Sequence, residues 1–72
     1  MNKIYIVSIP VEDIILAAFT DMRECLEFVR SDLEGGVHPE LLWVTICPDG
    51  QKHDEQVDCL AVNFLRAGGR VR

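Results

Sequence analysis

The sequence predicts a single small α+β domain in which an antiparallel-type sheet carries its helices on one face. Three observations lead to this prediction. Two apolar segments of strand length lie close together at the start of the chain, an amphipathic segment with helical spacing follows, and a third apolar segment precedes a turn. Strands joined by a short hairpin cannot be parallel. The expected element order is ββαβα, with ββαββ as the alternative.

The first two strands are expected at residues 3–9 and 14–19. Both are rich in β-branched or other apolar residues. The first has no charge after Lys3, so we expect both of its faces to be covered, as in a central strand. Pro10 ends it because proline has no N–H group for the sheet ladder. Residues 10–13 then form the turn between the two strands.

A helix is expected next, with Thr20 or Asp21 as its N-cap and Gly35-Gly36 as its C-terminal stop. Its apolar positions follow the spacing of one helical face. These positions are Met22, Cys25, Leu26, Val29 and Leu33. Charged and polar residues occupy the other side, so the helix is predicted to pack one face on the sheet.

A third strand is expected at residues 41–47, followed by a turn at Pro48-Asp49-Gly50. Residues 55–67 admit two interpretations. Five apolar positions match helical spacing, with Asp54 as N-cap and Gly68-Gly69 as the stop, and this favours a helix. The alternative is a fourth strand, in which alternate residues share a face.

The chain has 72 residues, which allows one domain, residues 1–72. A chain of this size buries only about 60% of its unfolded surface, so its core is small. The small core and an apolar content of 49% lead us to expect self-association as a homodimer. Because the sequence starts at Met1 and carries no tag-like extension, we expect a complete short reading frame.

The cysteine content predicts a cytoplasmic protein with reduced thiols. The three cysteines, Cys25, Cys47 and Cys59, are odd in number and form no Cys-x-x-Cys pair. The first apolar segment is interrupted by Pro10 and two acids before a secretory signal or membrane span can form. We expect no membrane association.

The charge is unevenly distributed. Residues 1–58 hold all twelve acidic residues and four basic ones, whereas residues 59–72 hold three arginines and no acid, which together give the net charge of −5. An acidic body repels phosphates, so direct nucleic-acid binding is not expected. A nucleic-acid regulator that uses the tail of Arg66, Arg70 and Arg72 is kept as an alternative.

Cys47, His53 and Cys59 form the only Cys/His group worth testing for metal or thiol chemistry. Structural zinc sites use closely spaced pairs, whereas these residues lie six apart. Two ordinary thiols and a loop histidine therefore explain the group better. We predict no metal, no cofactor and no enzymatic activity, and keep a small metal-binding or thiol protein as the second alternative.

Two features are candidates for partner binding. Trp43 is expected on the strand face opposite Leu42, Val44 and Ile46. There it is either an exposed interface anchor beside Leu41 or part of the core. The acidic candidates are Glu12, Asp13, Glu24, Glu27, Asp32 and Glu34. We expect these carboxylates to face a basic, nucleic-acid-binding surface on a host protein.

The segment Phe19-Thr20-Asp21-x-x-x-Cys25-x-x-Phe28-Val29, after a strand with Tyr5-Ile6-Val7, resembles a pattern in small phage and prophage accessory proteins. The resemblance covers about the first half of the chain. It implies a short protein that inhibits a host enzyme or defence complex by direct binding, as anti-CRISPR proteins do. It transfers no catalytic residue. The predicted function is a small acidic protein-binding module, of the phage-inhibitor type, in the host cytoplasm.

Overall fold

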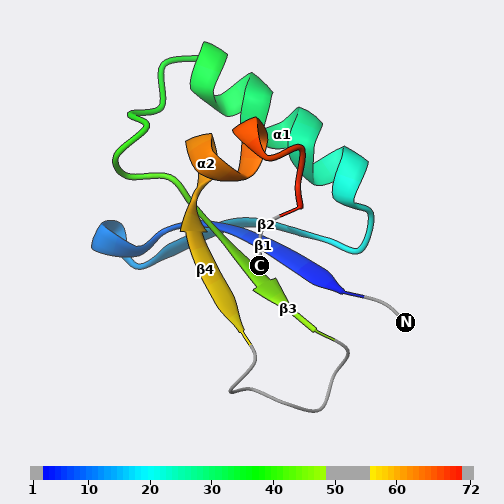
Figure 1. Ribbon diagram of the computed structural model, residues 1–72. Coiled ribbons are helices and arrows are strands. Elements are labelled where there is room, and N and C mark those ends of the chain that lie inside the picture. Colours follow the sequence, from blue (N-terminus) through cyan, green and yellow to red (C-terminus); the bar gives the residue numbers. More distant parts are fainter. Residues whose placement is uncertain (1–2, 49–55, 71–72) are drawn as a thin grey trace.

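The computed structural model describes residues 3–48 and 56–70 (Figure 1). Within these residues it confirms the α+β fold, an antiparallel sheet of four strands in the order β2-β1-β3-β4 with two α-helices. The strands are β1 (Ile4–Ile9), β2 (Ile14–Phe19), β3 (Trp43–Cys47) and β4 (Val57–Leu60). The helical elements are η1 (Pro10–Glu12), α1 (Met22–Glu34) and α2 (Ala61–Arg66).

The first hairpin forms at the expected residues. Pro10 ends β1 and opens the short 3-10 helix η1, and the Asp13 N–H donates to the Pro10 carbonyl at 2.9 Å. Asp13 takes the left-handed conformation, with φ of 56°, which lets the chain reverse into β2. The β1–β2 register shifts between Val7 and Ser8, which leaves Leu16 as an extra residue in a β-bulge on β2.

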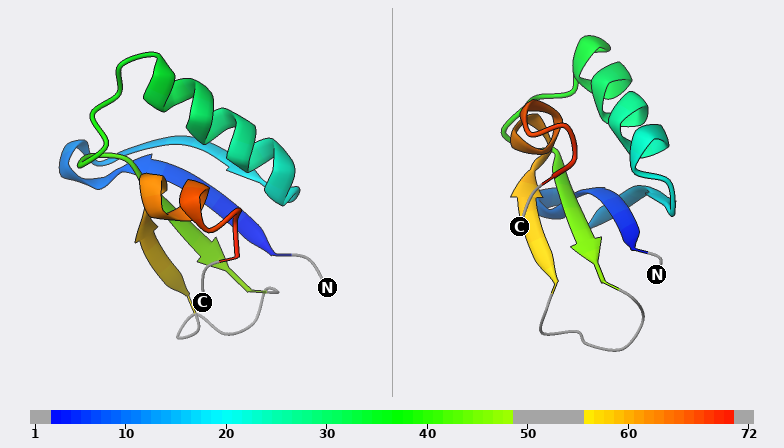
Figure 2. Two further views of the ribbon diagram at one scale, coloured as in Figure 1. Left: turned by 45° about the horizontal axis from the view of Figure 1, so that its top comes forward. Right: turned by 45° about the vertical axis from the view of Figure 1, so that its right-hand side comes forward.

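β1 is a central strand, as predicted, but the expectation that both of its faces are covered is wrong. Both helices lie on the same face of the sheet (Figure 2). Tyr5 and Val7 point toward the helices and are buried, whereas Ile4, on the other face, is 40% exposed. The sequence of β1 gave no sign of this difference, because Ile4, Ile6 and Ser8 on its second face carry no charge although neither described helix covers them.

α1 confirms the predicted helix. The Asp21 carboxylate accepts a hydrogen bond from the Arg23 N–H at 2.9 Å and so caps the first turn. The helix ends at Glu34, and Gly35 is its C-cap. Cys25 and Val29 are fully buried against the sheet. The spacing of apolar residues thus identified the face that packs on the core.

Residues 57–66 combine the two structures that the sequence offered as alternatives. Val57–Leu60 pairs with β3 as β4, and the chain then turns into α2 with Leu60, not Asp54, at the N-cap. Asp54 lies outside the described residues. Residues 57–60 form a strand because they pair with β3. Val57 lies opposite Ile46, and Cys59 lies opposite Val44, on the face that the helices cover. The predicted helix start was therefore too early.

The core lies between the helices and one sheet face, and α2 closes it. Phe64, Leu42 and Val44 are fully buried, and the rings of Phe64 and Tyr5 are 5.9 Å apart. The Ala61 N–H donates to the Leu42 carbonyl at 2.8 Å, which ties the start of α2 to the segment before β3. No helix among the described residues is both long and apolar enough to span a bilayer.

Asp32 is held at an unfavourable position near the end of α1. Its Oδ2 atom is buried and has no hydrogen-bond partner among the described residues. Burial raises the pKa of this carboxyl. The carboxylate also lies in the last turn of α1, where the helix dipole disfavours negative charge. The ionised side chain therefore costs the folded state free energy.

We expect Asp32→Asn to raise the free energy of unfolding at neutral pH by about 0.3–1 kcal/mol. The folded state binds the Asp32 proton more tightly than the unfolded state, because its folded pKa is raised. Stability of the natural chain therefore rises as pH falls through that raised pKa, and the advantage of Asn disappears below the ordinary pKa of an aspartate. Urea unfolding of both proteins across this pH range measures the difference. Glu27→Gln, on the exposed middle of α1, is the control, and a gain that grows on acidification contradicts this account.

Candidate functional site

The sheet face that points away from both helices is the main candidate surface, and we call it the open face. Along β3 it carries the residues that alternate with the core positions, because successive strand side chains point to opposite faces. The register places Trp43 opposite Leu60 and Thr45 opposite Asp58. The open face is defined by Ile4, Ile6, Trp43, Thr45, Asp58 and Leu60.

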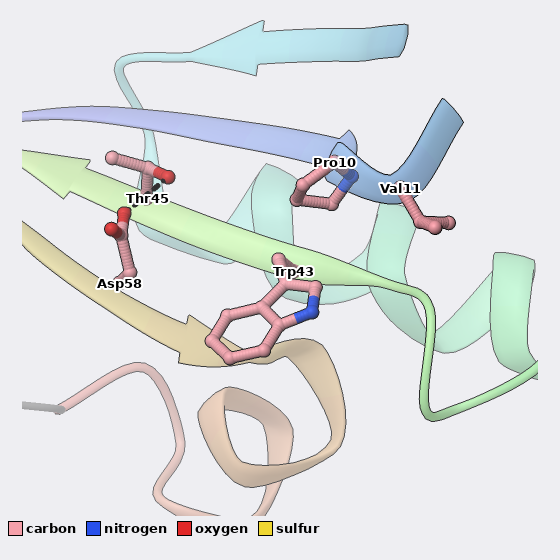
Figure 3. Close-up of a pocket in the computed structure, with 5 residues that line it drawn as sticks. All are labelled: Pro10, Val11, Trp43, Thr45 and Asp58. Atoms are coloured by element: carbon pink, nitrogen blue, oxygen red, sulfur yellow. Dashed lines mark hydrogen bonds between the residues drawn. The ribbon is translucent and has the colours of Figure 1, made fainter. Parts of the chain in front are cut away.

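A broad depression of about 460 Å³ lies at one end of the open face (Figure 3). It is lined by Pro10, Val11, Trp43, Thr45 and Asp58. The pairing of β1 with β3 explains why η1 lies beside Trp43. Ser8 of β1 lies opposite Trp43, and η1 begins two residues later. The depression thus joins the hairpin to the centre of the sheet, and we call it the Trp43 groove.

The Trp43 groove is mostly apolar with one fixed polar edge. Trp43 is half-buried, and Val11 is 74% exposed. The Thr45 hydroxyl donates to Asp58 Oδ1 at 2.7 Å, which orients an exposed carboxylate at the margin (Figure 3). An apolar floor with a few oriented polar groups is a surface that binds a partner through shape and selects it through hydrogen bonds.

The predicted acidic residues divide between two places. Glu12 and Asp13 are exposed and directly follow Pro10 and Val11, so they lie at the hairpin end of the Trp43 groove. The helix acids lie on α1, in the layer on the other face of the sheet (Figure 1). These are Glu24, Glu27, Asp32 and Glu34. The structure therefore brings Trp43 together with the turn of Glu12 and Asp13, and not with the acids of α1.

The thiols do not form the metal group considered above. Val44 and Ile46 are buried on the helix side, so Cys47, in alternation with them, points to the open face. Cys59 pairs with Val44 and therefore points the other way. His53 lies outside the described residues. Cys47 and Cys59 are on opposite faces of the sheet, and the described residues hold no group of three metal-binding side chains.

The two thiols on the helix side are poorly suited to nucleophilic chemistry. Burial, and then the nearby Cys59, raise the pKa of Cys25 to about 12. Burial, and then Asp58, raise the pKa of Cys59. Both groups therefore remain protonated thiols at neutral pH, and the thiolate is the reactive form. Cys25 contributes to the core as a small apolar side chain.

The arginine tail is only partly described. Arg66 lies in the last turn of α2 and Arg70 follows it, and both are exposed. Arg72 lies outside the described residues. α2 belongs to the helical layer, so Arg66 is not part of the open face (Figure 2).

Sequence reasoning identified Trp43 but missed its neighbours. The helix that the spacing predicts over residues 55–67 includes Asp58 and Leu60, so it gives no sign that they share a sheet face with Thr45 and Trp43. The alternation of Val57 and Cys59 with Asp58 and Leu60 was the available signal. Pro10 and Val11 were treated as turn residues only. Comparison with family models, with curated proteins and with solved structures finds no match for this chain.

Proposed function

We propose that this chain is a protein-binding module and that the open face, centred on the Trp43 groove, is its binding surface. The observation that carries the proposal is a partly exposed tryptophan in an apolar depression, on a sheet face that neither helix of the described residues covers. Tryptophan is enriched among the residues that contribute most binding energy at protein interfaces. Large contiguous patches of exposed apolar surface are uncommon on monomeric proteins, and they mark interaction sites.

The charges around the Trp43 groove indicate the kind of surface that a partner must have. Glu12, Asp13 and Asp58 are exposed at or beside the Trp43 groove, and the whole chain has a net charge of −5. A partner with an apolar contact surrounded by basic residues complements this arrangement. Such pairing speeds association and weakens as salt rises. A basic surface that normally holds nucleic acid has the required chemistry.

The specific form of this proposal is an inhibitor of a host enzyme or defence complex. An acidic module docked on a basic groove occludes that groove, so no catalytic residue is needed. The resemblance of residues 5–29 to short phage accessory proteins supports this form. The thiols of the buried Cys25 and the half-buried Cys59, protonated at neutral pH, also favour binding over catalysis.

The test is capture of a partner from bacterial lysate with matched variants, followed by titration of the purified pair. Trp43→Ser removes the central aromatic, and Val11→Ser removes an apolar side chain so exposed that folding does not depend on it. Glu27→Gln with Glu34→Gln on α1 is the control. We expect Trp43→Ser to weaken binding at least about 30-fold, as loss of an interface anchor does, and the α1 control to change it little. Binding that survives both open-face changes, or is lost only in the α1 control, contradicts the proposal.

A further inference from the structure

We propose that a second copy of this chain binds along strand β2, so that two molecules form one continuous sheet. This homodimer stands independently of the proposed function, because it uses the edge of the sheet and not the Trp43 groove. The small core predicts self-association, and this proposal places that self-association at strand β2.

β2 is an edge strand that lacks the charges and prolines that usually protect against pairing, and its β-bulge at Leu16 is the one protective feature it has. It is the outermost strand, and β1 pairs with only one of its sides. All six residues from Ile14 to Phe19 are apolar. Ile15 is 71% exposed, Ile14 41% and Leu16 39%. Natural edge strands commonly carry charges, prolines or very short ladders, because unpaired N–H and C=O groups otherwise recruit another strand.

The opposite edge of the sheet, strand β4, is protected against pairing with another strand. β4 has only four residues and includes the exposed Asp58. A charge and a short ladder make this edge a poor acceptor for another strand. A head-to-tail contact between β2 and β4 of another copy is therefore disfavoured, and with it an open chain of molecules. Pairing of β2 with itself closes after two copies.

A second copy is the occupant that matches this edge best. β2 has no charge although the chain has a net charge of −5, so the strand offers nothing to a charged ligand and suits another uncharged apolar strand. Two identical strands pair antiparallel about a two-fold axis, which makes the contact self-complementary. The β-bulge at Leu16 adds twist and limits the length of the shared ladder.

The two-fold axis of such a pair is perpendicular to the sheet, which fixes the shape of the dimer. Both helical layers then lie on one side, and both open faces join on the other side. The two Trp43 grooves face the same way, so one dimer presents two copies of the binding surface. Trp43, on β3, is separated from the new contact by β1 and β2.

The size and charge of the contact predict its affinity. Pairing one six-residue strand with its copy buries less than the roughly 1,200 Å² of a standard interface, so we expect dissociation in the micromolar range. Glu12, Asp13 and Asp21 flank β2, and antiparallel pairing brings like charges together at each end. Salt screens this repulsion. We therefore expect the dimer to become tighter as salt rises, whereas binding of the basic partner is expected to become weaker.

Sedimentation velocity over a concentration series, with amide hydrogen exchange at both ends of the series, tests the proposal. Ile15→Lys places a charge on the exposed edge, and Leu41→Lys makes the same charge change at an exposed leucine in the α1–β3 connection. Both changes reduce the net negative charge, so general repulsion alone favours the dimer in each. Circular dichroism of each variant shows whether it is folded.

We expect the natural chain and Leu41→Lys to dimerise, with β2 amides becoming protected as concentration rises. Ile15→Lys is expected to weaken the dimer at least about tenfold, because each copy loses an apolar side chain at the contact and brings a positive charge there. A natural chain that stays monomeric at millimolar concentration overturns the proposal. So does a dimer that Ile15→Lys leaves intact, or protection that appears at β4. None of these results alters the partner-capture experiment, which depends on Trp43 and Val11.

Discussion

Phe64→Ala is expected to leave about half of the molecules or more unfolded at 25 °C. Phe64 is fully buried, its ring meets that of Tyr5 at 5.9 Å, and it fastens α2 to the sheet. Replacing a buried phenylalanine by alanine costs about 3–5 kcal/mol, which includes the cavity that remains. The core of a domain of this size supplies only about 3–5 kcal/mol in total. The loss therefore matches the whole stability of the domain, and circular dichroism in a urea series measures it.

Phe28→Ala is the matched control for Phe64→Ala. Phe28 also contacts an aromatic ring, that of Phe19 at 5.3 Å, but it is only half-buried at the margin of the core. The same chemical change should therefore cost clearly less, and Phe28→Ala should remain folded at 25 °C. Equal losses for the two variants would show that α2 does not close the core in the way described.

Gly69→Ala is expected to lower the free energy of unfolding by about 1–3 kcal/mol. Gly69 has φ of +85°, which costs an L-residue about 1–2 kcal/mol. It is also buried, and a Cβ atom added there meets the side chain of Met22 in the first turn of α1. The Met22 side chain is flexible and half-buried, so it can move aside, and we expect this to add no more than about 1 kcal/mol. Thermal and urea unfolding measure the combined effect.

Gly68→Ala separates the two contributions. Gly68 and Gly69 end α2 together, through N–H bonds to the carbonyls of Leu65 at 3.0 Å and Phe64 at 2.9 Å. Gly68 has φ of +64°, but a Cβ atom there meets nothing within 4 Å. Its replacement should cost the conformational part alone. In a Met22→Ala background the two glycine substitutions should cost the same. A persistent difference would mean that Met22 is not the obstacle.

The sequence predicted best those elements whose position and ends are determined by residues within the element itself. α1 has an apolar face at helical spacing, a capping Asp21 and a glycine stop, and all three act within the segment. The β1–β2 hairpin is bounded by Pro10 in the same way. The split of residues 57–66 into β4 and α2 depends instead on the remote partner β3, so no local pattern could decide it.

The candidate site shows the same division. The strand alternation around Trp43 predicted the face on which it lies. Sequence reasoning could not tell which face the helices cover, because neither face of β1 carries a charge. The Trp43 groove also requires β3 and β4 in register and η1 at the end of β1. Residues from three separate parts of the chain meet there, and only the tertiary fold brings them together.

Quenching of tryptophan fluorescence by acrylamide tests the central claim, that one sheet face is left open around Trp43. Trp43 is the only tryptophan in the chain, so the whole signal reports on this face. In the folded, dilute protein we expect quenching clearly above that of an indole sealed in a core but below that in denaturant, because Trp43 is only partly exposed. The Ile15→Lys variant should behave in the same way. Emission that resists acrylamide, as from an indole sealed in a core, would contradict an open face.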